Sequence, residues 1–137
     1  MRRSAGRRKF FSTLNVKRLR IAVVDDEAHV RKALERLMRG AGFEVETYAN
    51  GSEFLSRFTQ DAADCVVLDV HMPGISGFDV QDALRARGAR VPVVVITGKD
   101  AAGAAGHAIA AGACAYLRKP VDGAQLIDAI TRATAPS

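Results

Sequence analysis

A regular alternation between short apolar runs and amphipathic segments constrains the fold of this 137-residue chain more than any other feature of its sequence. Five apolar runs of four to six residues lie at 20–24, 43–48, 65–68, 91–96 and 114–117. Each run is followed by a segment whose apolar residues recur every three or four positions, as in helices that bury one face. These segments lie at 28–40, around Phe54, at 78–87, within 100–111 and at 122–133.

Three of the five runs are almost purely aliphatic, which is typical of strands buried on both faces of a parallel sheet. The sequence therefore predicts an α/β fold, a doubly wound five-stranded parallel sheet with helices on both faces. The fourth helical segment is the weakest. Four glycines lie between positions 98 and 112, and Ile109 is the only large apolar residue there. Because glycine costs a helix interior up to about 1 kcal/mol against alanine, we expect this helix to be the loosest.

Charge divides the chain into two parts. The net charge is +5, but residues 1–20 hold eight basic residues and no acid, and the remainder is acidic by three charges. We predict a basic, disordered leader at 1–18, one domain at 19–134 and a short tail at 135–137. A domain of this length buries a core without metal or disulfide staples.

Neither export nor a membrane span is predicted. The leader contains "RRKFF", which is similar to a twin-arginine export signal, but the next nine residues are polar and charged rather than apolar. The chain has no long uncharged apolar run, so we expect a cytoplasmic protein without a membrane segment. Cys65 and Cys114 lie in strand-like segments without metal-ligand spacing, and we expect two buried, reduced thiols.

Polar residues follow four of the five predicted strands. Asp25 and Asp26 follow the first, Asp69 the third, Thr97 the fourth and Lys119 the fifth. The carboxyl ends of parallel strands meet at one edge of the sheet, where α/β proteins bind ligands. Three carboxylates at one place repel one another unless a cation joins them, and carboxylate oxygens are ligands that Mg²⁺ prefers. The sequence thus predicts a magnesium site at this edge.

These residues occur in familiar motifs: "VVDDE", "DVHMPGISG", "ITG" and "YLRKP". Asp69 stands 43 residues after Asp26, Thr97 stands 28 residues after Asp69, and Lys119 stands 22 residues after Thr97. With this order and spacing, residues 19–133 resemble a receiver domain of two-component response regulators, with wording closest to the FixJ-type branch. The resemblance implies a flavodoxin-like (CheY-like) sheet with strand order 2-1-3-4-5.

The resemblance also implies roles at the site. Asp69 would be the phosphoacceptor. Asp26 and Asp69, with the backbone carbonyl of His71, would hold Mg²⁺, and Asp25 would assist through water. Lys119 would pair with the phosphoryl oxygens, as phosphoryl transfer to a carboxylate requires neutralised charge.

Further residues would transmit the signal. The Thr97 hydroxyl would hydrogen-bond the phosphoryl group, Tyr116 would be the aromatic switch, and Pro120 would follow a cis peptide bond. His71 and Lys99 stand two residues after Asp69 and Thr97 respectively, and we expect their side chains to tune the lifetime of the phosphoryl group.

The implied protein is not an enzyme but a phosphoacceptor with intrinsic autodephosphorylation. Its phosphodonor would be a sensor histidine kinase or a phosphotransfer protein. We expect a stand-alone receiver that signals to a partner protein through its fourth helix, fifth strand and fifth helix, without binding nucleic acid. Two alternatives stay open: the basic leader contacts DNA, or the chain is the receiver part of a larger DNA-binding regulator.

An enzymatic alternative is weaker. Haloacid-dehalogenase-type phosphatases also use an aspartate nucleophile, a threonine, a lysine and an acidic pair with Mg²⁺. Their nucleophile comes first, in a D-x-D motif, whereas here the acidic pair comes first and His71 stands two residues after Asp69. A Walker-type nucleotide site is absent because Lys99 is followed by Asp100 rather than serine or threonine.

Overall fold

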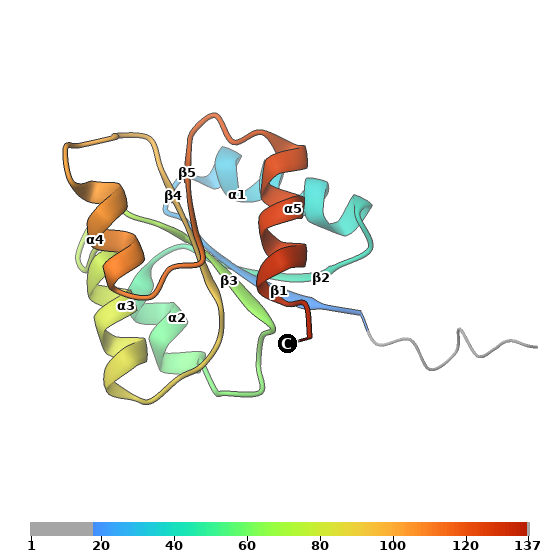
Figure 1. Ribbon diagram of the computed structural model, residues 1–137. Helices are drawn as coiled ribbons and strands as arrows, with labels where there is room; N and C mark the ends of the chain where they lie inside the picture. Colours follow the sequence, from blue (N-terminus) through green and yellow to red (C-terminus); the bar gives the residue numbers. More distant parts are fainter. Residues whose placement is uncertain (1–17, 137) are drawn as a thin grey trace, which may run out of the picture.

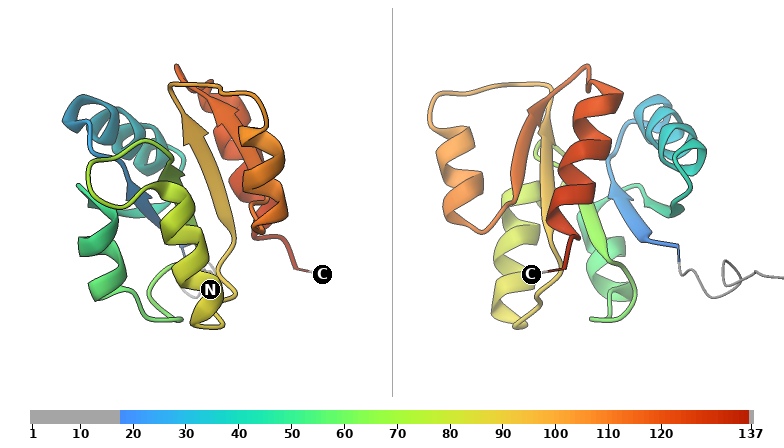
Figure 2. Two further views of the ribbon diagram at one scale, coloured as in Figure 1. Left: turned by 90° about the vertical axis from the view of Figure 1, so that its left-hand side faces the viewer. Right: turned by 45° about the vertical axis from the view of Figure 1, so that its right-hand side comes forward.

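The computed structural model describes residues 18–136, which form one parallel five-stranded sheet between two layers of helices (Figures 1 and 2). The strands run in the order β2-β1-β3-β4-β5, which confirms the predicted doubly wound topology. The strands are β1 (Arg20–Val24), β2 (Glu44–Tyr48), β3 (Cys65–Asp69), β4 (Val93–Thr97) and β5 (Ala115–Arg118). The helices are α1 (Ala28–Gly40), α2 (Gly51–Arg57), α3 (Gly77–Ala86), α4 (Ala104–Ala110) and α5 (Gly123–Ala133).

The two helical layers bury the two faces of the sheet. Leu34 of α1 and Leu126 of α5 pack on one face, whereas α2, α3 and α4 pack on the other. Every residue of β3 and β4 is buried, as the aliphatic runs predict for central strands. Successive side chains of a strand point to opposite faces, so Val66 and Val67 enter different cores.

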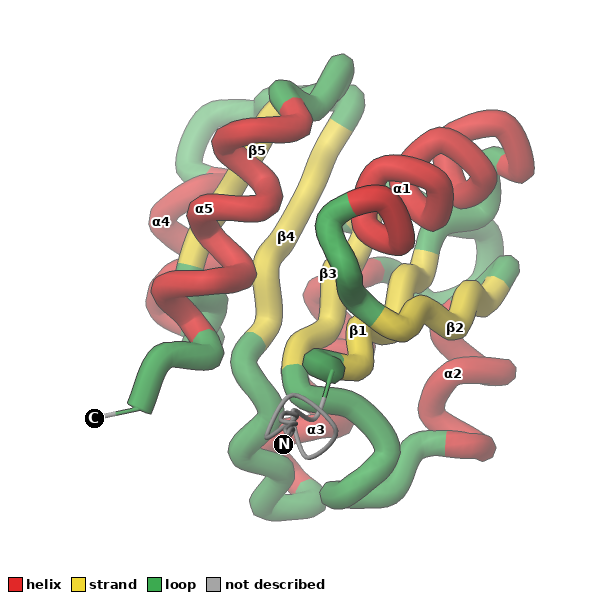
Figure 3. Tube along the Cα trace, turned by 90° about the vertical axis from the view of Figure 1, so that its right-hand side faces the viewer, coloured by secondary structure: helices red, strands yellow, loops and turns green. Residues whose placement is uncertain are grey.

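The edge strand β2 has a different pattern, with only Val45 and Tyr48 buried. Figure 3 shows this strand at one side of the sheet, next to β1. Its outer rim is partly covered by α1, because Nη2 of Arg39 donates a hydrogen bond to the backbone carbonyl of Val45 at 2.9 Å. The predicted half-exposed strand at 43–48 is therefore confirmed, one residue shorter than expected.

The loop after β3 is anchored at both ends. Gly77 opens α3 so close to β3 that a Cβ atom there would overlap the backbone carbonyl oxygen of Asp69. The Gly77 amide donates to the carbonyl of Val70 at 2.8 Å. Ser76 caps the helix in a capping box with Asp79. These contacts fix the backbone on both sides of the "HMPGIS" loop and hold Asp69 at the sheet edge.

Helix α4 has seven residues and lies inside the segment 100–111, where a short helix is expected, and it buries only Ala108. Gly103 precedes it with a φ of 82°, a left-handed conformation that favours glycine. Ile109 is 50% exposed on its surface. The expected looseness of α4 stays a prediction, but its small buried face is consistent with it.

One expectation about the cysteines is wrong. Cys65 is buried, and burial raises the pKa of its thiol to about 12. Cys114, the residue before the edge strand β5, is exposed. Of the described helices, none is both long and apolar enough to cross a membrane. The leader predicted at 1–18 lies almost entirely outside the described residues.

Candidate functional site

Three carboxylates meet at the carboxyl edge of the sheet, as the strand ends predict. Asp25, Asp26 and Asp69 each offer an oxygen, and these oxygens lie within 4.8 Å of one another. Asp25 is completely buried and Asp69 is 2% exposed, whereas Asp26 is partly exposed. The cluster therefore combines two desolvated carboxylates with one that faces the solvent.

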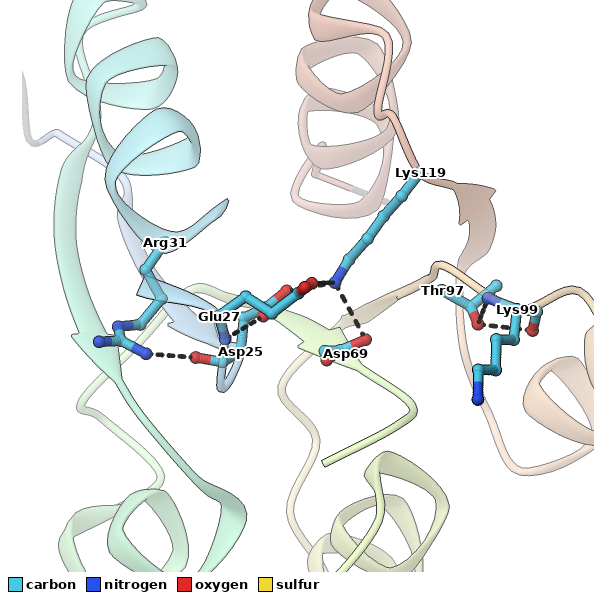
Figure 4. Close-up of polar contacts among 7 residues, drawn as sticks. All are labelled: Asp25, Glu27, Arg31, Asp69, Thr97, Lys99 and Lys119. Atoms are coloured by element: carbon cyan, nitrogen blue, oxygen red, sulfur yellow. Dashed lines mark hydrogen bonds and ion pairs between the residues drawn. The ribbon is translucent and has the colours of Figure 1, made fainter. Parts of the chain in front are cut away.

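Lys119 extends from the end of β5 into this cluster (Figure 4). Its Nζ lies 2.8 Å from Oδ2 of Asp25 and 3.4 Å from Oδ1 of Asp69. It also donates to Oε1 of Glu27 at 3.0 Å. One ammonium group thus neutralises part of the charge of three carboxylates. Lys119 lies next to Thr97, the last residue of β4, because the Lys119 amide donates a hydrogen bond to the Thr97 carbonyl at 2.7 Å.

The charges at the site perturb one another. Burial, together with the neighbouring charge of Asp25, raises the pKa of Asp69 from 3.8 to about 7. Burial lowers the pKa of Lys119, but its bonds to Asp25 and Glu27 outweigh that effect and leave this pKa above its ordinary value. The hydrogen bond from Lys119 lowers the pKa of the exposed Glu27. Asp69 is therefore a carboxylate whose ionised form needs additional positive charge, and a bound cation would supply it.

Three hydrogen bonds, from the loop after β1, from α1 and from β2, hold Asp25 in place. The Glu27 amide donates to Oδ1 of Asp25 at 2.9 Å, and Nη1 of Arg31 donates to the Asp25 carbonyl at 2.8 Å. The Asp25 amide donates to the carbonyl of Tyr48 at 3.1 Å. Sequence reasoning missed Glu27 and Arg31. Only the position of Glu27 directly after the acidic pair could have suggested its role.

The residues expected to transmit a signal lie on the neighbouring strands β4 and β5. The Thr97 hydroxyl donates to the Lys99 carbonyl at 2.8 Å and accepts from the Lys99 amide at 3.1 Å, so it is directed at the loop after β4. The Tyr116 hydroxyl donates to Oδ1 of Asp100 at 3.0 Å, and Arg118 bonds the other oxygen of that carboxylate at 3.1 Å. Tyr116 is therefore held at the surface by the loop that leads to α4.

Three further predicted residues are placed as follows. The peptide bond between Lys119 and Pro120 is cis, as the resemblance implies. The side chain of His71 is exposed, two residues beyond β3. Lys99 is exposed as well, and its ammonium forms no ion pair within residues 18–136.

Comparison with known proteins places this geometry in a family. The response regulator receiver domain family matches residues 21–131. The response regulator protein TodT of Pseudomonas putida is 38% identical over 113 residues, which cover 82% of this chain and 50% of TodT. The transcriptional regulatory protein PrrA of Mycobacterium tuberculosis is 41% identical over 108 residues, which cover 79% of this chain and 46% of PrrA. The chain spans about half the length of these curated relatives.

A solved structure agrees with the sequence relatives. The chemotaxis protein CheY4 of Vibrio cholerae superposes with a TM-score of 0.78 at 28% identity, covering 85% of this chain and 99% of that one. The strand order and the acidic edge of the sheet are thus those of a CheY-like fold, and the chain belongs to the response regulator receiver domain family of two-component systems.

Proposed function

We propose that this protein accepts a phosphoryl group on Asp69 from a phosphohistidine of a sensor kinase or phosphotransfer protein. The observation that carries the proposal is the placement of Asp69. This carboxylate is buried at the end of a central strand, 3.4 Å from an ammonium group and beside two other acids. Among the described aspartates only Asp25 is also buried beside Lys119, but it lies in the loop after β1, whereas Asp69 is the last residue of the central strand β3.

The transfer itself is a substitution at phosphorus. An Oδ atom of Asp69 forms a bond to phosphorus while the bond between phosphorus and the histidine nitrogen breaks, and the electron pair of that bond returns to the imidazole. Lys119, which already lies between Asp69 and Asp25, pairs with the phosphoryl oxygens as their charge arrives. Positioning and charge neutralisation of this kind account for most of the catalysis in phosphoryl transfer.

A divalent cation fits the acidic cluster. Three carboxylates within 4.8 Å of one another form a hard oxygen donor set, and the pKa of Asp69 is raised by its burial and by the neighbouring charge of Asp25. We propose that Asp26 and Asp69 with the backbone carbonyl of His71 hold Mg²⁺, and that Asp25 acts through a water molecule. Bound Mg²⁺ would supply charge neutralisation for the nucleophile and the incoming phosphoryl oxygens.

The response to phosphorylation is proposed to begin at Thr97. Its hydroxyl is now used by the Lys99 backbone, so a phosphoryl group on Asp69 competes with two existing hydrogen bonds. When Thr97 turns inward, the loop after β4 moves, and with it Asp100, which holds the Tyr116 hydroxyl. Each hydrogen bond contributes about 1 kcal/mol, so a few exchanged bonds suffice to shift a two-state equilibrium.

The decisive experiment is incubation of the protein with Mg²⁺ and a small phosphodonor, followed by intact-mass measurement. We expect one added phosphoryl group that is released by hydroxylamine, as an acyl phosphate is. Asp69→Asn should acquire none. Asp61→Asn is the matched control, because Asp61 is exposed and distant from the cluster, and it should be modified like the wild type. Modification of Asp69→Asn at the wild-type rate would exclude Asp69 as the acceptor.

For the output, we propose a cytoplasmic protein that contacts a downstream protein through α4, β5 and α5. The exposed side chain of Ile109 and the Tyr116 hydroxyl lie on these elements, next to the loop that Thr97 controls. Direct DNA binding by the leader is the alternative. An electrophoretic shift that is sensitive to salt and lost when Arg7, Arg8 and Lys9 are replaced by glutamine would favour it.

A further inference from the structure

A hollow of about 280 Å³ lies at the edge of the sheet, beside β2 and the first three residues of β1, and none of the three aspartates of the acidic cluster lines it. We call it the β2 hollow. Its existence follows from element lengths. The seven residues of α2 cover about 10 Å, whereas the five residues of β1 or β2 extend about 16 Å. Helix α2 therefore ends before the starts of β1 and β2 are covered, and the segment after the helix lines the hollow through Phe58, Ala62 and Ala63.

The wall of the β2 hollow is aromatic. Tyr48, Phe54 and Phe58 line it, with ring centroids 5.4 Å apart in both neighbouring pairs. Phe54 is almost completely buried, whereas Phe58 is only partly buried. The hollow therefore offers aromatic contacts to an apolar or aromatic side chain that enters it.

The glutamates at the rim of the β2 hollow leave a net negative charge there, because the arginines at the rim are paired with other acids. Four charged residues line it: Arg20, Arg39, Glu44 and Glu46. The two arginines are already engaged, Arg20 by Asp64 and Arg39 by Glu35 at 2.9 Å. Glu46 accepts only the neutral Tyr48 hydroxyl at 3.0 Å, and the exposed carboxylate of Glu44 has no ion-pair or hydrogen-bond partner within residues 18–136. An occupant of the hollow should therefore combine an aromatic side chain with positive charge.

We propose that the β2 hollow binds the segment Arg7–Phe11 of the same chain. This segment reads Arg-Arg-Lys-Phe-Phe, so it brings two aromatic rings next to three cations. It lies outside the described residues. Arg20, nine positions after Phe11, itself lines the hollow. Nine residues reach about 30 Å when extended, which is more than the chain needs to fold back.

A modest intrinsic affinity is enough for this contact. A short flexible connection gives a tethered segment an effective concentration in the millimolar range. A contact with a dissociation constant near 1 mM between separate molecules would then be about half occupied within the chain. The contact also removes three cations from the surface, so the leader would be less available to DNA. The proposal is independent of phosphoryl transfer at Asp69.

The test is nuclear magnetic resonance on the full chain at low concentration and low salt. We expect cross-relaxation between the rings of Phe10 or Phe11 and the methyl group of Ala63. The double variant Phe10→Ala/Phe11→Ala should lose these signals and shift the amide resonances of Tyr48 and Phe58. The matched control Leu14→Ala/Val16→Ala removes apolar leader residues outside the segment and should leave those resonances in place.

Charge and concentration complete the test. Glu44→Gln removes one rim charge from an exposed position, and it should weaken the contact and reduce its sensitivity to salt. Wild-type amide resonances at the hollow that do not move in Phe10→Ala/Phe11→Ala would overturn the proposal. Signals that grow with protein concentration would also overturn it, because they would assign the occupant to a second molecule.

Discussion

The raised pKa of Asp69 implies that ionisation of this carboxyl destabilises the folded state, which can be tested without a phosphodonor. In the metal-free protein, Asp69→Asn should be more stable than the wild type at pH 8. The folded state raises the pKa of this carboxyl from 3.8 to about 7, a difference of about 3 units. At about 1.4 kcal/mol per unit, ionised Asp69 costs the folded state up to about 4 kcal/mol. Asparagine has nearly the same shape without the charge, so it avoids this cost.

The sign of the pH dependence follows from proton binding. Between pH 4 and pH 7 the folded state binds more protons at this position than the unfolded state, so the wild type loses stability as the pH rises through 7. Near pH 4 the folded state is protonated at this position and the unfolded state is about half ionised, so the variant should gain less than about 1 kcal/mol. Mg²⁺ should narrow the difference at pH 8, because a ligand at 100 times its dissociation constant stabilises the wild type by about 2.7 kcal/mol.

Urea unfolding at pH 4, 6 and 8, with and without Mg²⁺, measures these differences. With a denaturant slope of about 2 kcal/mol per molar, the urea midpoint of Asp69→Asn should rise by up to about 2 M at pH 8. Asp26→Asn makes the same chemical change at the partly exposed member of the cluster and should give a smaller gain. An Asp69→Asn variant that is no more stable than the wild type at pH 8, or equally stabilised at pH 4, would refute the electrostatic reasoning.

Three further predictions follow from the site and its supports. Gly77→Ala places a Cβ atom against the backbone at the end of β3 and should destabilise the protein by roughly 2–4 kcal/mol in thermal unfolding. The control Gly106→Ala adds a Cβ atom in open space on α4 and should be neutral or stabilising in that assay. Lys119→Met leaves buried carboxylates without their ammonium partner. It should therefore lower metal-free stability at pH 8 by roughly 3 kcal/mol and slow phosphorylation by small phosphodonors. Unchanged values in both urea unfolding and a phosphorylation time course would contradict this prediction. His71→Ala and Lys99→Ala should change the lifetime of the phosphoryl group without changing stability by more than about 0.5 kcal/mol, because both side chains are exposed; phosphate-release rates identical to the wild type would remove the idea.

The strand ends made the main site residues predictable. Asp25, Asp26, Asp69, Thr97 and Lys119 all follow apolar runs, and parallel strands bring such positions to one edge whatever the details of packing. This rule needs only the strand order and the run boundaries.

The pattern of apolar runs does not predict the contacts of Glu27 and Arg31. Glu27 reaches Lys119 only because its amide is bonded to Asp25, which orients the start of α1. Arg31 reaches the Asp25 carbonyl from the first turn of α1, whereas a helix-surface arginine is by default solvated. Both contacts are decided by the conformation of one turn.

Run boundaries also misplace strand ends by one or two residues. Hydropathy ends the third strand at Leu68, but Asp69 continues the ladder opposite Ile96. It starts the fourth strand at Val91, although Val93 is the first residue of β4. Backbone pairing, rather than side-chain hydropathy, sets these ends, and Pro92 still accepts a hydrogen bond from Val66 before the strand begins.

The guanidinium of Arg39 has a consequence for how molecules of this protein meet. An uncovered edge strand is a template on which a second chain can add a strand. Here the Val45 carbonyl on that rim is already occupied, and the glutamates at 44 and 46 flank it with negative charge. A neighbouring chain would have to displace the arginine and bring complementary cations before it could extend the sheet on this side, so a single side chain of α1 protects against sheet-to-sheet aggregation.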